Sequence, residues 1–248
     1  MKIAILDGYT STMGELDWKS FEAFGEVAVY DRTPKDKIIE RARGAEVVLT
    51  NKVPMFGEQI GALPELRYIG VLATGYNNVD LQCAKSRGIA VTNIAEYGTD
   101  SVAQAVFAHI LNIANKTEEH SQSARAGDWS KCADICYCLA PLTEIAGKTI
   151  GIVGYGAIGR KVAQIAKAFG MEVAAYSPSR PAGTSDTAAR FTTLDDLLRS
   201  SDIISLNCVL NDSTREMVNA ESIAKMKDGA WIVNTGRGGL VNLSLIHI

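Results

Sequence analysis

Residues 148–169, KTIGIVGYGAIGRKVAQIAKAF, decide the fold of this chain. The apolar run 149–153 predicts a buried strand, and residues 160–169 have the spacing of an amphipathic helix. Between them stands the glycine pattern Gly-Tyr-Gly-Ala-Ile-Gly, residues 154–159. A strand, this pattern and a helix in succession are typical of a Rossmann dinucleotide-binding unit. We therefore favour a dinucleotide site over a glycine-rich turn that holds no ligand.

Each glycine of this fingerprint has its own expected role. Gly154 permits the tight turn from strand to helix, Gly156 lets the backbone approach a pyrophosphate, and Gly159 lets the helix pack closely on the strand. The N-terminus of the helix adds free N–H groups and a partial positive charge. The turn is therefore expected to hold the diphosphate of the cofactor.

The next informative position lies about 20 residues farther on, where NAD-specific folds place an acidic residue on the adenosine ribose. This chain has Ser177 there, followed by Pro178, Ser179 and Arg180. Small hydroxyls and a guanidinium suit a 2'-phosphate, so the cofactor is NAD or NADP, with NADP favoured. The alternative is that Arg180 points into solvent, and the sequence leaves both open.

An arginine follows the last apolar strand of the chain. The run AWIVNT, residues 230–235, predicts a strand that leads into Gly236, Arg237 and two more glycines. Open α/β sheets place their ligands at the carboxyl ends of strands. Arg237 therefore stands where its planar guanidinium can meet a carboxylate or a polarised carbonyl oxygen.

Short apolar runs alternate with helical patterns on both sides of the fingerprint, which predicts parallel sheets covered by helices. We expect an α/β fold with two doubly wound parallel-sheet domains. They are a flavodoxin-like domain over residues 1–98 and a Rossmann domain over residues 99–248. A helix is expected near 15–24, and a longer one over 99–116, opened by a capping box at Ser101 and Gln104. Residues 120–147 show no clear period and predict the end of that helix followed by an excursion.

Composition excludes several classes of protein. The chain has 248 residues, 47% of them hydrophobic, which suits a globular protein, and a net charge of −3 with scattered Lys and Arg argues against a nucleic-acid partner. The N-terminal apolar run is too short for a membrane span and lacks a signal peptide's cleavage pattern, so we expect a cytoplasmic protein without membrane contact.

Neither the cysteines nor the histidines suggest a site. Five cysteines in irregular spacing indicate reduced thiols, and the cluster in KCADICYC lacks the pairing and the fourth ligand of a zinc or iron–sulfur centre, so no metal is expected. The histidines are His109, within an apolar helix, His120, at its polar end, and His247, at the end of the chain. None of them stands next to a motif.

Together the motifs resemble those of the D-isomer-specific 2-hydroxyacid dehydrogenases, and among these the hydroxypyruvate reductase or glycerate dehydrogenase branch. The resemblance covers nearly the whole chain. In order, the matching motifs are VLATGYNNVD (71–80), TDSVAQ (99–104), IAGKTIGIVG (145–154), GYGAIG (154–159), ISLNCVLNDST (204–214) and WIVNTGRGG (231–239). Several motifs in the family's order are far more specific than any one of them.

The resemblance implies an active site between a substrate domain and a cofactor domain, a small 2-keto or 2-hydroxy acid as substrate, and a homodimer that associates through the cofactor domain. It gives Arg237 the part of orienting the keto acid and polarising its carbonyl. It also implies three groups of contacts: Lys52, Thr74 and Gly75 for the substrate, Thr74 also facing the nicotinamide end of the cofactor; Ala157, Ile158 and Ser177 for the pyrophosphate and ribose; and Cys208, Val209, Thr214, Thr235 and Gly236 for the adenine and nicotinamide sides.

The sequence also departs from the family. Val209 stands where a proline is usual, and Asn207 where a histidine is frequent. After Asn242 the chain reads LSLIHI, without the family's acid–base glutamate and histidine. We therefore expect a C-terminally truncated chain in which both domains are incomplete. Such a chain would turn over poorly, because hydride transfer to a ketone needs a proton donor.

Two alternatives remain at this point. One is a non-catalytic NAD(H)-binding sensor or corepressor-like protein, since the same fold serves in that way elsewhere. The other lies within the enzyme class, where formate or phosphite oxidation is possible because the residues that choose among small anions are not readable from motif spacing.

Overall fold

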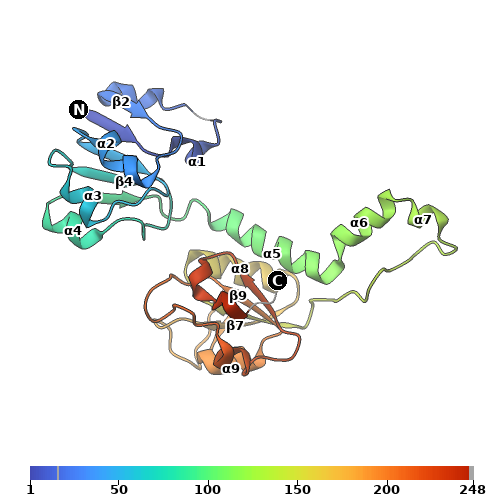
Figure 1. Cartoon of the computed structure of the whole chain (residues 1–248). Helices are drawn as coiled ribbons and strands as arrows, with labels where there is room; N and C mark the ends of the chain where they lie inside the picture. The colour runs from blue at the N-terminus through green and yellow to red at the C-terminus, as the bar shows by residue number, and fades with distance from the viewer. Residues whose placement is uncertain (16, 246–248) are drawn as a thin grey trace. The chain divides into compact units, whose positions relative to one another are not determined.

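The computed structural model describes residues 1–15 and 17–245, and His247 lies outside the described residues. The chain divides into two compact units, Met1–Tyr97 and Gly98–Ile248. Each unit contains one parallel sheet with its own helices (Figure 1).

The first unit is a five-stranded parallel sheet of order β2-β1-β3-β4-β5, which is the flavodoxin-like order expected from the sequence. Its strands are β1 (Lys2–Ile5), β2 (Glu26–Val29), β3 (Val47–Thr50), β4 (Tyr68–Val71) and β5 (Ala90–Asn93). Its helices are α1 (Gly8–Thr12), α2 (Ile38–Ala42), α3 (Gly57–Gly61) and α4 (Leu81–Ser86), with 3-10 turns η1 (Lys19–Phe24) and η2 (Lys35–Lys37). The three central strands are almost wholly buried, because helices cover both faces.

The second unit is also a five-stranded parallel sheet, of order β10-β9-β6-β7-β8. Its strands are β6 (Thr149–Val153), β7 (Glu172–Tyr176), β8 (Arg190–Phe191), β9 (Ile203–Leu206) and β10 (Trp231–Asn234). Its helices are α5 (Thr99–Asn115), α6 (Thr117–Arg125), α7 (Asp128–Lys131), α8 (Ala157–Ala168), α9 (Leu194–Ser200) and α10 (Ala220–Ile223), with 3-10 turns η3 (Gly238–Leu240) and η4 (Leu243–Leu245). Chain order reverses between β6 and β9, so the predicted Rossmann topology is confirmed, and the fingerprint follows the strand at the switch point.

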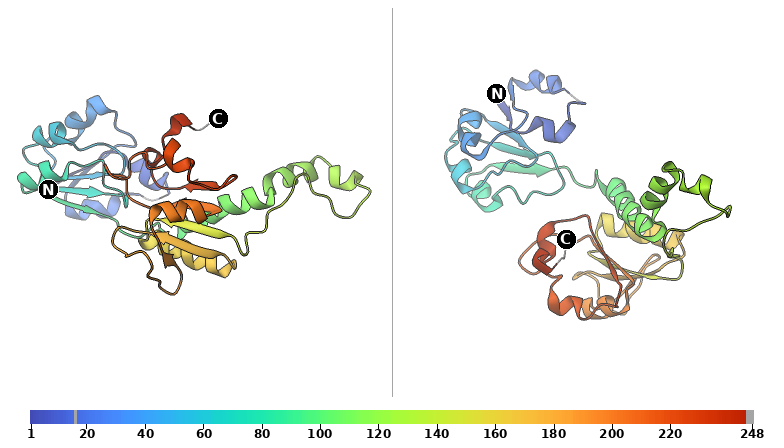
Figure 2. Two further views of the ribbon diagram at one scale, coloured as in Figure 1. Left: turned by 90° about the horizontal axis from the view of Figure 1, so that it is seen from below. Right: turned by 45° about the vertical axis from the view of Figure 1, so that its right-hand side comes forward.

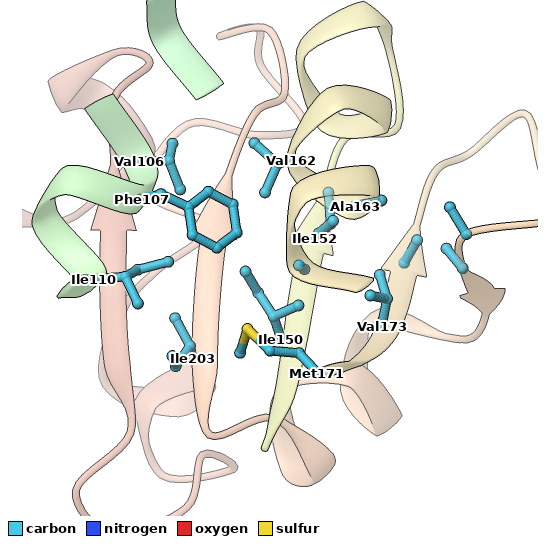
Figure 3. Close-up of a cluster of buried hydrophobic side chains, with 14 of the residues drawn as sticks. Val106, Phe107, Ile110, Ile150, Ile152, Val162, Ala163, Met171, Val173 and Ile203 are labelled. Atoms are coloured by element: carbon cyan, nitrogen blue, oxygen red, sulfur yellow. The ribbon is translucent and has the colours of Figure 1, made fainter. Parts of the chain in front are cut away.

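One core fixes the helix that follows the fingerprint. Figure 3 shows side chains of α5 and α8 packing together over β6. Helix α5 contributes Val106, Phe107 and Ile110, helix α8 contributes Val162 and Ala163, and strand β6 contributes Ile150 and Ile152. Phe107 also stacks on Phe169, with ring centroids 5.4 Å apart. At the rim of this contact, Lys161 of α8 pairs with Asp100 of α5 at 2.9 Å. The position of α8, and with it the glycine turn, is therefore set by close packing.

Two local expectations were wrong, and two elements were not expected. Of the helix expected near 15–24, residues Lys19–Phe24 form a 3-10 turn, and an unexpected helix, α1, precedes it. The capping box at Ser101 and Gln104 does not form, because the N-cap of α5 is Gly98, three residues before Ser101. Strand β8 was not expected at all, since two residues show no periodicity.

The excursion after α5 contains two more helices. Residues 117–143, which we call the arm, comprise α6, α7 and an extended return that rejoins the unit where the Thr143 N–H donates to the Ala114 carbonyl at 2.9 Å. The arm stands clear of the second sheet in every view (Figure 1, Figure 2). Its return is held by His120, whose Nε2 accepts from the Leu139 N–H at 3.2 Å.

Within the part of the chain that the structure describes, no helix is both long and apolar enough to cross a membrane. The five cysteines are free thiols, and three of them, Cys132, Cys136 and Cys138, lie on the arm. Among residues 1–15 and 17–245 there is no group of three or more His, Cys, Asp or Glu side chains that could hold a metal ion.

Candidate functional site

The fingerprint turn has room only for glycine at two of its three glycine positions. Gly154 has a φ of +94°, and a Cβ there would lie 2.6 Å from the backbone nitrogen of Cys208. A Cβ on Gly159 would lie 2.2 Å from the carbonyl oxygen of Gly154. The first glycine therefore allows the turn to pass close to the end of β9, and the last allows α8 to begin directly against β6.

Gly156 differs from its neighbours because it borders open space. A Cβ on Gly156 would meet nothing within 4 Å. Gly156 is the N-cap of α8, no side chain caps this helix end, and its first turn carries no acidic residue. At this end of α8, the first backbone hydrogen bond runs from the Arg160 N–H to the Gly156 carbonyl. The N–H groups of Ala157 and Ile158 therefore remain free to bind a ligand. These groups fit a diphosphate.

Ser177, the residue expected to meet the ribose, lines an open pocket. Ser177 follows β7 directly, and its hydroxyl is 3.1 Å from that of Ser179. Ser177 and Arg180 line the same pocket of about 760 Å³, whose wall also contains Tyr176, Pro178, Ala182, Thr192, Thr193, Leu194 and Asp195. Its one carboxylate, Asp195, is paired with Lys225 at 3.0 Å and with Arg199 at 3.7 Å. This pairing weakens the carboxylate's repulsion of an anion in the pocket.

The carboxyl end of β9 brings the expected cofactor-wall residues beside the fingerprint. The Asn207 N–H donates to the Val153 carbonyl at 2.8 Å, which places Cys208 against Gly154. Cys208 is half-buried, and burial raises the pKa of its thiol. Val209, where the family usually has a proline, is 73% exposed. The hydroxyl of Thr214 donates to the Val209 carbonyl at 2.7 Å, so it closes this loop.

Arg237 follows β10 at the same edge of the sheet. The Asn234 side chain shapes its loop: its amide donates to the Arg237 carbonyl at 3.0 Å, and its oxygen accepts from the Gly236 N–H at 3.0 Å. Thr235 and Arg237 are both half-buried. Among residues 1–15 and 17–245, no carboxylate forms an ion pair with Arg237. Its positive charge therefore stays uncompensated by the described carboxylates of the chain.

The expected substrate contacts of the first unit lie at the carboxyl edge of its own sheet. Lys52 follows β3 and is exposed. Thr74 and Gly75 follow β4, the neighbouring strand. The Thr74 hydroxyl donates to the Ile94 carbonyl at 2.9 Å, which fixes this loop to the end of β5. The three residues thus share the edge where such sheets place ligands.

The sequence did not reveal the part played by Asp7. This carboxylate is 2% exposed and accepts from the backbone N–H groups of Asn51, Lys52 and Val53 at 2.8, 2.5 and 3.2 Å. It therefore shapes the loop that carries Lys52. An acidic residue at the end of the first apolar strand was the available signal, but its partners lie more than 40 positions away along the chain.

A further concave surface of about 420 Å³ includes no predicted site residue. Thr149 and Glu172, the first residues of β6 and β7, line it together with residues 185–190. It therefore lies at the amino edge of the second sheet, away from the edge that carries the fingerprint.

Comparison with known proteins agrees with this geometry. The sequence profile described as "D-isomer specific 2-hydroxyacid dehydrogenase, NAD binding domain" matches residues 107–246. A hydroxypyruvate reductase of Blautia hydrogenotrophica is 46% identical over 97% of this chain and 76% of its own length. A glycerate dehydrogenase of Methylorubrum extorquens is 40% identical over 85% of this chain, and the match spans 64% of that protein.

Solved structures show the same arrangement of elements. An acyclic imino acid reductase in complex with NADPH and D-Arg superimposes with a TM-score of 0.86 at 27% identity, covering 98% of this chain and 77% of that one. A D-lactate dehydrogenase from Aquifex aeolicus complexed with NAD and lactic acid gives 0.83 at 27% identity, covering 98% and 71%. Motifs, topology and similarity together show that this chain belongs to the D-isomer-specific 2-hydroxyacid dehydrogenase family.

Proposed function

We propose that this chain binds a nicotinamide dinucleotide on its second unit and serves in hydride transfer between that cofactor and a small 2-hydroxy or 2-keto acid. Glycerate, hydroxypyruvate and glyoxylate are the substrates we favour, because the relatives of this chain include a hydroxypyruvate reductase and a glycerate dehydrogenase. The observation that carries the proposal is the open N-terminus of α8 at the switch point of a Rossmann sheet, with Arg237 at the same edge.

In the proposed reaction, some residues bind the cofactor or the acid, and Arg237 also polarises the carbonyl group of the acid. When bound, the nicotinamide supplies or accepts the hydride. Arg237 presents a fork that suits the carboxylate of the acid, and its charge stabilises the negative charge that develops on the carbonyl oxygen. Thr235 and Gly236 border the nicotinamide side, and the first unit contributes substrate contacts from Lys52 and the loop 74–75.

This function is tested by titrating the protein with NADPH and NADH in a calorimeter and then following oxidation of the reduced cofactor after adding hydroxypyruvate or glyoxylate. We expect binding of a dinucleotide, with any oxidation of the reduced cofactor slow and dependent on the keto acid. A folded protein that binds neither dinucleotide would contradict the proposal at its first step.

We propose NADP as the preferred cofactor. Ser177 occupies the ribose position without a negative charge, and Arg180 lines the same pocket. A carboxylate at this position accepts from the ribose hydroxyls of NAD and repels a 2'-phosphate, whereas a serine does neither so strongly. The pairing of Asp195 with Lys225 also limits the negative charge of the pocket.

The Ser177→Asp variant tests this preference. We expect the parent protein to bind NADPH at least as tightly as NADH, and Ser177→Asp to weaken NADPH by about ten-fold or more, because two like charges at contact distance repel. Ser177→Asn is the matched uncharged control and should change the ratio of the two dissociation constants much less. A parent protein that strongly prefers NADH would contradict the assignment of Arg180 to the phosphate.

We also propose that the protein forms a homodimer through the arm. The arm stands clear of the second sheet (Figure 2). It carries several large apolar side chains that are exposed. Ile135 is 87% exposed and Trp129 is 56% exposed, with Leu139 and Leu142 exposed beside them in sequence. A second copy of the chain offers the same apolar surface, as an isologous interface requires.

Sedimentation equilibrium measures this assembly. We expect the parent protein to have twice the mass of one chain, and Ile135→Asp to shift it towards a single chain, because a buried unpaired carboxylate opposes association. Phe24→Asp is the control, since Phe24 is 64% exposed but lies in the first unit. A parent protein that sediments as a single chain would rule out the arm as a dimer contact.

A further inference from the structure

A chain of contacts connects the fingerprint to Arg180. The guanidinium carbon of Arg180 lies 5.4 Å from the centre of the Phe191 ring. Phe191 meets the ring of Tyr155 edge to face, with centroids 4.9 Å apart and planes at 87°. Tyr155 is the second residue of the fingerprint, and its hydroxyl donates to Asp186 at 3.1 Å. None of these contacts was expected from the sequence.

The middle of this chain of contacts is rigid. Phe191 is 1% exposed and Tyr155 is 6% exposed. Asp186 accepts three hydrogen bonds. One comes from the Tyr155 hydroxyl at 3.1 Å, and the backbone N–H groups of Ala188 and Ala189 each donate one at 2.9 Å. A carboxylate with three fixed donors has little freedom to turn, so the segment 186–191 is anchored to the fingerprint.

The protonation states favour this hydrogen bond at neutral pH. Burial, and after it the hydrogen bond to Asp186, raises the pKa of Tyr155 to about 12, so the hydroxyl remains a donor. Burial acts to raise the pKa of Asp186, but the two backbone N–H groups and the Tyr155 hydroxyl outweigh it and hold that pKa below its usual value. At neutral pH the Tyr155 hydroxyl is therefore protonated and the Asp186 carboxylate is ionised.

The loop between β7 and β8 carries Ser177 and Arg180 and closes on the same anchor. The Gly183 N–H donates to the Phe191 carbonyl at 2.9 Å, and the Phe191 N–H donates to Thr184 at 2.8 Å. At the other end of the loop, the Arg180 N–H donates to the Ser177 carbonyl at 3.0 Å. Phe191 thus holds the part of this loop at Gly183 and Thr184, and the guanidinium of Arg180 lies over the Phe191 ring.

We propose that Tyr155 is a positioning residue for cofactor selectivity: through Asp186 and Phe191 it holds Arg180 where the guanidinium meets a 2'-phosphate. This inference rests on the proposed binding of NADP. An arginine side chain loses much rotational freedom when it is fixed, and a cation held over an aromatic face has already lost part of it before the ligand arrives. Only the cofactor that carries the 2'-phosphate gains from this arrangement.

Tyr155→Phe tests the proposal because it removes one hydroxyl and keeps the buried ring. We expect its dissociation constant for NADPH to rise about five-fold, as the loss of a hydrogen bond to a charged group allows, while that for NADH stays nearly unchanged. Phe191→Leu, which keeps an apolar side chain but removes the aromatic face under Arg180, should give the same selective loss. Tyr68→Phe, which removes a hydroxyl bonded to Thr92 in the first unit, is the matched control.

A double-mutant cycle identifies the route. If Tyr155 acts through Arg180, then Tyr155→Phe should have no further effect on NADPH affinity in an Arg180→Ala background. Equal weakening of both cofactors, an unchanged ratio of the two dissociation constants, or the same effect with and without Arg180 would each overturn the proposal. The preference for NADP itself is read separately from the parent protein, so its failure is distinguishable from failure of this inference.

Discussion

We expect the Gly156→Val variant to fold as the parent protein does and to bind neither NADPH nor NADH measurably. The backbone at Gly156 has a φ of −82°, outside the left-handed region that favours glycine, and a Cβ there meets no protein atom within 4 Å. In the proposed function the pyrophosphate occupies this open space, where it meets the bare backbone at the N-terminus of α8. A branched side chain fills it and should raise both dissociation constants by about a hundred-fold or more.

Two measurements separate loss of the site from loss of the fold. Thermal unfolding of Gly156→Val should remain close to that of the parent protein, while calorimetric titration with either dinucleotide shows no binding. Gly61→Val is the matched control, because Gly61 is also an exposed glycine whose Cβ would meet nothing within 4 Å, but it lies in the first unit. Unchanged affinity in a folded Gly156→Val protein would mean that the fingerprint is only a turn.

The regular elements were predictable where burial leaves a pattern in the sequence. Strands such as β6 and β9 are buried on both faces and therefore read as continuous apolar runs. The same reasoning fails for α1 and α6, whose sequences GYTST and TEEHSQSAR have no apolar stripe. Helices of this kind are held by contacts that the sequence does not display, such as the bond from Leu139 to His120.

The residues of the candidate site also differ in how far the sequence predicts them. The three fingerprint glycines form a local sequence pattern, so the pattern alone predicts their roles, although the close approach of Gly154 to Cys208 shows only in the folded structure. Their contact with a cofactor remains a prediction. The parts played by Asp7 and Asp186 depend on partners that are 44 and 31 positions away. The periodicity of the sequence does not reveal such partners, because only the folded sheet determines which strand ends become neighbours.

Arg237→Ala is expected to lower kcat/KM for hydroxypyruvate or glyoxylate by about a hundred-fold or more while the affinity for NADPH stays nearly unchanged. Truncation of one partner of a charged hydrogen-bonded pair has an effect of this order. In the proposed function the guanidinium contacts the acid and stabilises the transition state, and it does not contact the dinucleotide. The fold should tolerate the change, because Arg237 is half-buried and no carboxylate of the described residues depends on it for charge compensation. Calorimetric binding of the keto acid to the NADPH-loaded protein gives the same comparison without turnover.

The conservative variant shows what the guanidinium contributes beyond charge. Arg237→Lys keeps the positive charge but loses the planar fork, so it should recover only part of the keto-acid affinity and of kcat/KM. Arg43→Ala, which removes an exposed arginine of the first unit, is the control and should leave both quantities unchanged. If Arg237→Ala binds and reduces the keto acid as the parent protein does, Arg237 does not contact the substrate, and the polarising charge must come from another residue. If the affinity for NADPH falls together with that for the keto acid, Arg237 instead supports the cofactor pocket. A residue that contacts only the acid should leave the binding of NADPH unchanged when no acid is present.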